Sequence, residues 1–182
     1  LMLSNVDRPP QVIVSTSAMP GEGKTTVAIA LAQNFADLGQ RVLLIEGDIR
    51  RRVFDRYFDL DRNDGLLSVL AGARSFEAVV QRVERIGVDV LAGGHSASNA
   101  ADLFASARFA TLIQGLRQRY DIVLIDTPPI LLVPDTRIVA QIADAVLLAV
   151  KWDHTSRAQL AEASRQFDIA STQITGLVLT QI

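Results

Sequence analysis

The residues best suited to do chemistry lie in one short segment near the N-terminus, Ser17–Thr26. A nucleotide's phosphates need converging backbone N–H donors, a positive charge and a hydroxyl group that can bind Mg²⁺. Gly21 and Gly23 let the backbone curl, Lys24 carries the charge, and Thr25 carries the hydroxyl. The spacing therefore predicts a phosphate-binding loop that opens a helix.

The loop is a variant of the strict pattern, because Ala18 stands where that pattern has glycine. A glycine-rich turn that only caps a helix is the alternative, but such a turn would not require Gly-Lys-Thr directly after a buried strand. We expect the loop and the first helical turn to contact the nucleotide through Met19, Pro20, Gly21, Glu22, Gly23, Lys24, Thr25 and Thr26.

Two aspartates follow apolar strands and can serve the same site. Asp126 closes the run Ile122–Ile125, and Asp48 comes two residues after the run Val42–Glu46. A single aspartate at a strand end is usually a solvated or turn-capping residue. Two of them beside a phosphate loop favour a magnesium site, with Thr25, Asp48 and Asp126 as the metal-binding residues.

The elements that must position these residues alternate between short Val/Ile/Leu runs and stretches of helical period. This pattern predicts an α/β fold of the P-loop NTPase type, a three-layer sandwich in which a mostly parallel central sheet has helices on both faces. We expect the small, polar segment Gly93–Asn99 to be a surface loop near the site. The predicted strands are 12–15, 42–46, 88–91, 122–126, 146–150 and 176–180, and the predicted helices are 24–38, 66–71, 76–85, 108–120, 134–142 and 156–167.

Composition excludes several classes of function. The chain has 182 residues, a formal net charge of −2 and no cysteine, so neither a broad nucleic-acid-binding field nor thiolate chemistry is expected. No apolar stretch approaches the roughly 18–20 residues of a membrane span, and the start does not look like a signal peptide. We expect one domain, residues 1–182, of the kind found in the cytosol.

Taken together, the motifs resemble the bacterial tyrosine kinases that control capsule and exopolysaccharide synthesis, a branch of the MinD/ParA-like P-loop ATPases. Ser15–Thr26 is similar to their first Walker motif, Val42–Arg51 to their additional acidic motif, and Tyr120–Pro129 to their second Walker motif. The resemblance implies a protein-tyrosine autokinase that transfers the γ-phosphoryl group of ATP, with Mg²⁺, to tyrosines of a neighbouring copy.

The resemblance also implies roles for single residues. Lys24 and the loop amides would stabilise the transferring phosphoryl group, and Asp48 and Asp126 would hold the water shell of the metal. The family's acidic motif begins with aspartate, but this chain has Glu46, so Glu46, Asp48 and Asp126 remain joint candidates for the catalytic base. Arg50 would touch phosphate or a partner subunit, and a solvated basic turn is the alternative for its neighbours Arg51 and Arg52.

Departures from the family keep two rivals open. Positioning and partition ATPases carry a signature lysine where this chain has Met19, which favours the kinase. Glu46 keeps open a nucleotide-sensing regulatory module with weak or no kinase activity. The family's last strand commonly ends in asparagine, whereas Thr180 stands here.

Some family features are expected to lie outside this sequence. The N-terminal assembly helix, the membrane region and the C-terminal tyrosine cluster are not recognisable, and both tyrosines, Tyr57 and Tyr120, are expected to be internal. The resemblance implies a ring-like homo-oligomer, a transmembrane activator, either separate or fused, and a cognate tyrosine phosphatase. It also implies a cytoplasmic domain attached to the bacterial inner membrane.

Overall fold

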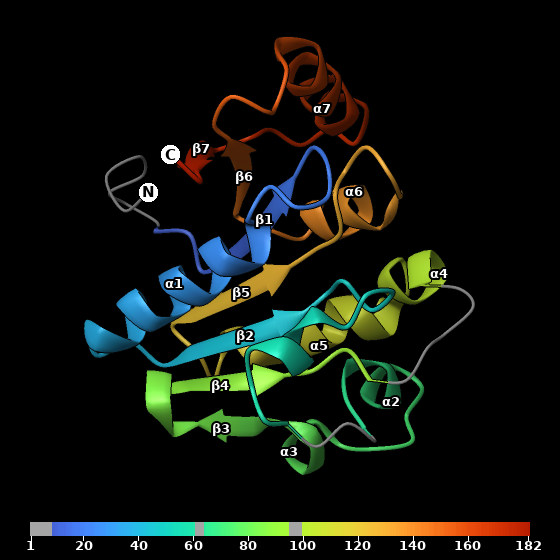
Figure 1. Cartoon of the computed structure of the whole chain (residues 1–182). Helices are drawn as coiled ribbons and strands as arrows, with labels where there is room; N and C mark the ends of the chain where they lie inside the picture. Colours follow the sequence, from blue (N-terminus) through green and yellow to red (C-terminus); the bar gives the residue numbers. More distant parts are fainter. Residues whose placement is uncertain (1–8, 61–63, 95–99) are drawn as a thin grey trace.

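The computed structural model describes residues 9–60, 64–94 and 100–182. Its described strands form one sheet in the order β3-β4-β2-β5-β1-β6-β7, and every neighbouring pair is parallel except β3 and β4 (Figure 1). The strands are β1 (Val12–Ser17), β2 (Val42–Glu46), β3 (Gln81–Val83), β4 (Val88–Leu91), β5 (Ile122–Asp126), β6 (Ala145–Lys151) and β7 (Gly176–Thr180). The predicted α/β sandwich is confirmed.

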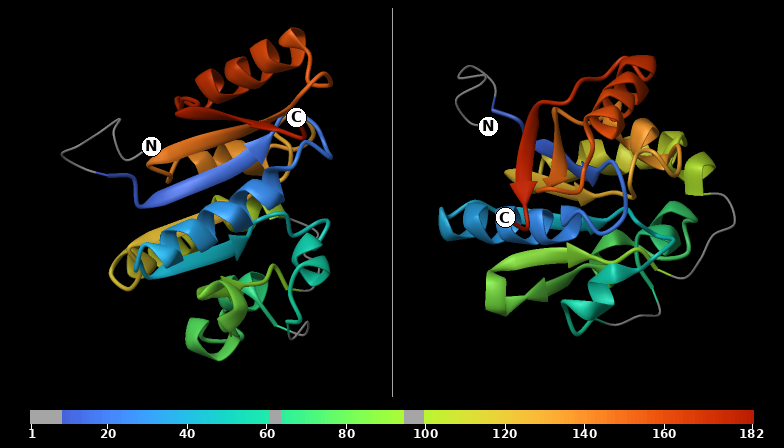
Figure 2. Two further views of the ribbon diagram at one scale, coloured as in Figure 1. Left: turned by 60° about the vertical axis from the view of Figure 1, so that its left-hand side comes forward. Right: turned by 45° about the horizontal axis from the view of Figure 1, so that its top comes forward.

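Helices cover both faces of this sheet, and the carboxyl ends of its central strands lie at one edge (Figure 1). The α-helices are α1 (Lys24–Asp37), α2 (Leu66–Leu70), α3 (Phe76–Val79), α4 (Ala100–Phe104), α5 (Ala107–Arg117), α6 (Asp135–Ala140) and α7 (Arg157–Ile169), and the 3₁₀ turns are η1 (Val53–Arg56) and η2 (Glu84–Ile86). Two further views show α7 at the β6–β7 end of the sheet and α2 and α3 at the opposite end (Figure 2).

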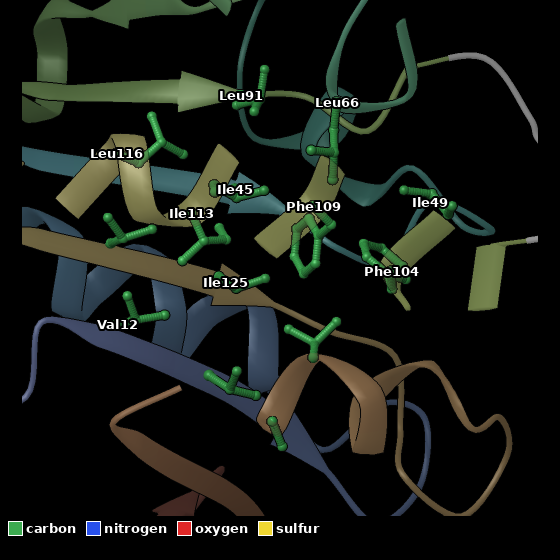
Figure 3. Close-up of a cluster of buried hydrophobic side chains, with 14 of the residues drawn as sticks. Val12, Ile45, Ile49, Leu66, Leu91, Phe104, Phe109, Ile113, Leu116 and Ile125 are labelled. Carbon is green, nitrogen blue, oxygen red and sulfur yellow. The ribbon is translucent and has the colours of Figure 1, made fainter. Parts of the chain in front are cut away.

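Side-chain alternation along the strands sends apolar groups into two cores, because successive residues of a strand point to opposite faces. On one face, Ile13 and Leu44 pack against α1 through residues such as Phe35. On the other face, Phe109, Ile113 and Leu116 of α5 point at the strands (Figure 3). A sheet that is buried on both sides explains why its strands read as continuous apolar runs in the sequence.

The predicted helix over residues 76–85 is wrong in its second half. Only Phe76–Val79 is α-helical, and Gln81–Val83 forms the strand β3 antiparallel to β4, followed by the 3₁₀ turn η2. Val80 leaves the helix with extended φ and ψ of −69° and 137°, and the chain returns through Gly87 at φ 63°. Helix α4 (Ala100–Phe104) was not among the predicted helices. No helix in the three described segments is long and apolar enough to cross a membrane.

One carboxylate ties three elements together at the amino edge of the sheet. Asp144, just before β6, accepts hydrogen bonds from the backbone N–H groups of Gln11 (3.0 Å) and Val12 (2.7 Å). It also pairs with Arg117 at the end of α5, at 2.7 Å. Burial raises the pKa of Asp144, but the hydrogen bonds from Arg117 and from the two amides outweigh it and leave the pKa lowered.

We predict that Asp144→Asn lowers the free energy of unfolding at pH 7 by about 1–2 kcal/mol, because charge-assisted hydrogen bonds to β1 and α5 are weakened. Urea unfolding measures this change. The lowered pKa means that the stabilisation is present above aspartate's ordinary range and is lost as the pH falls through the folded-state pKa, so variant and wild type should converge in acid.

The matched control is Glu162→Gln, which breaks an exposed pair with Arg165 at 2.7 Å within α7 and should change stability little. Equal losses in the two variants would contradict a special role for Asp144.

Candidate functional site

The predicted site residues lie at the carboxyl ends of three adjacent strands, β2, β5 and β1. Register places Asp126 beside Ser15 of β1 on one side and beside Glu46 of β2 on the other. The phosphate loop leaves β1 and enters α1 at the same edge (Figure 1). Parallel strands thus bring together residues that are up to about one hundred positions apart in the sequence.

Two glycines allow this convergence. Gly23 caps the N-terminus of α1 at φ 85°, a left-handed conformation that side chains disfavour. Gly47 follows β2 and donates its N–H to the carbonyl of Asp126 at 2.7 Å. A Cβ at Gly47 would lie 2.9 Å from that same carbonyl oxygen, so glycine permits the approach of Asp48 to β5.

The centre of the site is a buried cluster of one ammonium group, one hydroxyl group and two carboxylates. Lys24 Nζ lies 3.3 Å from Asp48 Oδ2 and 3.5 Å from Asp126. Thr25 donates its hydroxyl hydrogen to Asp126 Oδ2 at 2.6 Å. The side chains of Asp48 and Asp126 are at most 1% exposed. The predicted catalytic and metal-binding residues Lys24, Thr25, Asp48 and Asp126 therefore form one cluster, in which Lys24 lies close to both carboxylates.

The electrostatics of this cluster are unbalanced, because two carboxylates face one ammonium. Burial raises the pKa of Asp126 to about 6, against the opposing effects of Lys24 and Thr25. Asp48 Oδ2 is buried and, apart from its ion pair with Lys24, accepts no hydrogen bond from the described residues. The cluster thus has unused capacity for a cation.

This donor set fits Mg²⁺ bound together with phosphates. Carboxylate and hydroxyl oxygens are ligands that Mg²⁺ prefers, and Mg²⁺ in phosphate sites commonly uses only one or two protein groups. Within the described segments there is no group of three or more His, Cys, Asp or Glu residues that could hold a metal. The site is suited to share a metal with phosphates and water, with Asp48, Asp126 and Thr25 in reach.

Glu22 holds the phosphate loop in shape. Its side chain is fully buried and accepts the N–H of Met19 at 2.8 Å and the hydroxyl hydrogen of Thr155 at 2.6 Å. Thr180 donates its hydroxyl to the carbonyl of Glu22 at 2.8 Å. Thr155 follows β6 and Thr180 ends β7. Nothing in the sequence indicated that either residue supports the phosphate loop, because both lie far from it along the chain.

The structure gives Glu46 a bonding pattern unlike that of the two aspartates. Its carboxylate is buried and accepts backbone N–H groups from Phe54 at 2.8 Å and Gly93 at 2.9 Å. Burial raises the pKa of Glu46, and these two hydrogen bonds oppose that rise. Glu46 thereby fastens the segment after β2 to the segment after β4. The rest of the loop predicted there, residues 95–99, lies outside the described residues.

Arg50 is engaged by Asp135, with 3.0 Å between Nε and Oδ2. This hydrogen bond is the main cause of a raised pKa for Arg50. Asp135 is fully buried at the start of α6, and Arg50 is half exposed. Arg50 therefore connects the acidic motif after β2 to α6.

A cleft of about 270 Å³ opens over the cluster. The loop residues Pro20, Gly21, Gly23, Lys24, Thr25 and Thr26 line it, together with Asp48, Arg51, Val53, Arg56, Tyr57, Pro129 and Gln181. A larger hollow of about 690 Å³ lies at the amino ends of β2 and β4, around Arg41 and Arg82, and includes none of the predicted site residues.

The expectation that both tyrosines are internal is correct for Tyr120 and wrong for Tyr57. Tyr120 is buried and donates its hydroxyl to Asp89 at 2.8 Å. Tyr57 is 41% exposed and borders the cleft, because η1 turns Phe54 into the core and leaves the residue after the turn outside. Phe54, not Tyr57, supplies the buried ring of this aromatic stretch.

Comparison with known proteins identifies relatives over nearly the whole chain. The family model described as "AAA domain" matches residues 10–174. EpsB of Ralstonia solanacearum is 39% identical over 171 residues, which are 94% of this chain and 23% of EpsB. Tyrosine-protein kinase YwqD of Bacillus subtilis strain 168 is 36% identical over 176 residues, 97% of this chain and 74% of YwqD. The chain thus spans about a quarter of EpsB and most of YwqD.

Solved structures of similar fold point to the same family. The kinase domain of Escherichia coli tyrosine kinase ETK superposes with a TM-score of 0.95 at 28% identity, covering 100% of this chain and 71% of that one. A cobyrinic acid a,c-diamide synthase from Mycobacterium smegmatis, solved with ADP and magnesium, shares only the fold, at 19% identity and a TM-score of 0.75 over 93% of this chain and 71% of that one. On these likenesses, the chain belongs to the bacterial tyrosine-kinase family of P-loop proteins.

Proposed function

We propose that this chain, as a single domain over residues 1–182, is the catalytic core of an ATP-dependent protein-tyrosine autokinase that regulates exopolysaccharide or capsule synthesis. It would transfer the γ-phosphoryl group of ATP, with Mg²⁺, to tyrosines of a neighbouring copy. The observation that carries the proposal is the contact of Lys24 with Asp48 and Asp126 at the mouth of the loop, at 3.3 and 3.5 Å. Membership of the tyrosine-kinase family supplies the reaction class.

The residues divide the work of phosphoryl transfer by position. The loop amides and the N-terminus of α1 would hold the phosphates, since both direct N–H groups at an anion. Lys24 would carry positive charge to the transferring group, while Thr25, Asp48 and Asp126 would hold the metal. Bound magnesium would neutralise charge that develops on the phosphate oxygens.

We assign the proton acceptor for the tyrosine hydroxyl to Asp48. Among Glu46, Asp48 and Asp126, only Asp48 lines the cleft. Both oxygens of Glu46 are already bound to backbone amides, and Asp126 accepts the hydroxyl of Thr25. The substrate tyrosine must approach through the cleft, so Asp48 is the carboxylate that its hydroxyl would contact.

Family membership supports a proposal about the partners and the location of this domain. We propose that the protein self-associates into a ring-like homo-oligomer and works with a transmembrane activator, separate or fused, and with a cognate tyrosine phosphatase. The activator would attach this cytoplasmic domain to the bacterial inner membrane. Nucleic acid is not among the proposed partners.

We predict that Lys24→Ala abolishes phosphotyrosine formation when the protein is incubated with labelled ATP, Mg²⁺ and a tyrosine peptide. The matched control is Lys151→Ala, since Lys24 and Lys151 are the two lysines of the chain and Lys151 does not line the cleft. If the wild-type protein released ADP without label on tyrosine, it would be a positioning ATPase and not a kinase. Nucleotide binding with neither product would support a sensing module.

We predict that Asp126→Asn separates stability from activity. Removing one of two carboxylates leaves Lys24 and Asp48 as a balanced pair, so the variant should be more stable at pH 7 by about 1–2 kcal/mol. Transfer should fall by about a hundredfold or more, because a group that holds the metal is lost.

The pH dependence of stability tests the effect of the second carboxylate on Lys24. Because the folded-state pKa of Asp126, about 6, lies above the ordinary value of 3.8, wild-type stability relative to the variant should fall as the pH rises between these values. The control is Asp153→Asn, which changes an exposed carboxylate at φ 50°, a backbone conformation that asparagine also adopts. A variant less stable than wild type at pH 7 contradicts the charge-imbalance argument.

We predict opposite outcomes for Glu46→Gln and Asp48→Asn. A glutamine at 46 cannot accept both backbone N–H groups, so unfolding free energy should drop by about 1–2 kcal/mol with a partial loss of transfer. Asparagine at 48 should leave the fold stable and abolish transfer. Full loss of transfer with unchanged stability in Glu46→Gln would instead make Glu46 the base.

A further inference from the structure

One end of the cleft is positively charged. Arg51, Val53, Arg56 and Tyr57 follow β2 and line the cleft, whereas Gln181, which also lines it, follows β7. In the sheet order, β5, β1 and β6 lie between these two strands. The arginine end is therefore separated from the Gln181 end by Asp126 and the phosphate loop.

The guanidinium groups of Arg51 and Arg56 differ from those of their neighbours. Arg50 pairs with Asp135 at 3.0 Å, and Arg52 pairs with Asp55 at 3.6 Å. Arg51 and Arg56 are exposed and have no carboxylate partner among residues 9–60, 64–94 and 100–182. Exposed arginines elsewhere, such as Arg41 with Asp121 at 2.7 Å, are commonly paired. Two positive charges at the cleft are therefore available to a ligand.

The turn that carries Arg51 and Arg56 is stabilised by backbone hydrogen bonds and by a buried side chain. The carbonyl of Asp48 accepts the N–H groups of Arg51 and Arg52 at 3.2 and 3.1 Å, and Arg52 adopts φ 47°. Phe54, with no exposed surface, anchors η1 in the core, and its N–H is bound by Glu46. The turn that carries the arginines is thus tied to the proposed base through the carbonyl of Asp48.

Tyr57 adds an aromatic surface next to the two charges. Tyr57 is 41% exposed, and its ring is tilted against that of Phe58, with ring centroids 6.4 Å apart. An exposed ring beside guanidinium groups suits a ligand that is both aromatic and acidic, because rings stack on one another and arginine binds carboxylates through two N–H groups.

We infer that Arg51, Arg56 and Tyr57 form a docking surface for the acceptor, and that the acceptor is a tyrosine flanked by aspartate or glutamate residues. This inference rests on the proposed kinase function, since it names the substrate class of that site. The nucleotide's phosphates already have Lys24, the loop amides and the helix N-terminus, so the two arginines remain for the acceptor. Opposite charges would also speed the encounter at low salt.

The test compares two synthetic peptides, one with glutamates around a single tyrosine and one with glutamines in their place. The protein carries Tyr57→Phe throughout, so that its exposed tyrosine takes no label. Fluorescence anisotropy with Mg-ADP measures peptide binding, and phosphotyrosine formation with Mg-ATP measures kcat/KM. The variants are Arg51→Glu and Arg56→Glu, singly and together. The control is Arg157→Glu, an exposed arginine at the start of α7 that does not line the cleft.

We expect the acidic peptide to bind about five- to tenfold more tightly than the neutral one at low salt, since each exposed charge pair contributes a few-fold. The double variant should lose this preference, and the control should keep it. Added salt should reduce the preference by screening. Affinity for ADP should not change in any variant.

Each alternative outcome has its own meaning. Equal binding of the two peptides by the wild type, or a loss of ADP affinity in the arginine variants, would overturn the docking surface and leave the kinase proposal standing. Arginine-dependent binding of the acidic peptide without any phosphotyrosine would support the docking surface and remove the kinase proposal. The two proposals can therefore fail separately.

Discussion

The placement of one lysine between two buried carboxylates is the constraint on which the rest of this structure depends. Lys24 opens α1, Asp48 follows β2 and Asp126 ends β5, so the three charges meet only if β2, β5 and β1 are parallel neighbours. Buried charges are costly unless they are paired, and here the pairing is incomplete because one ammonium faces two carboxylates. Proteins commonly accept such local cost where a site must be ready for an ionic ligand.

The polar groups around this cluster act as fasteners between segments far apart in the chain. Glu22 binds Thr155 after β6, and Glu46 binds Phe54 after β2 and Gly93 after β4. Since both carboxylates are buried, these bonds are made away from water, where a lost partner is expensive. The conformation of the loops at the carboxyl edge of the sheet is thereby stabilised by hydrogen bonds from buried side chains.

The sequence was informative where a residue's role is local and poor where it depends on distant partners. The phosphate loop, its helix and the strand-end aspartates were predictable, because glycine spacing and apolar runs report directly on backbone and burial. Strand β3 was not predictable, because it is only three residues long and partly exposed, and its sequence resembles the continuation of the preceding helix. The exposure of Tyr57 was not predictable either, because it depends on Phe54 filling the core in its place. The contact of Thr155 with the phosphate loop was not predictable, because it depends on a distant residue, Glu22.

The bond from Thr180 to the phosphate loop has a spectroscopic consequence. The carbonyl of Thr180 also accepts the backbone N–H of Trp152 at 3.0 Å, and Trp152, the one tryptophan of the chain, is 58% exposed. Through Thr180, two hydrogen bonds thus connect the backbone N–H of Trp152 to the carbonyl of Glu22 in the phosphate loop. A rearrangement of the loop that altered these bonds would reach a single, solvent-facing fluorophore, so the emission of Trp152 offers an optical probe of the phosphate loop.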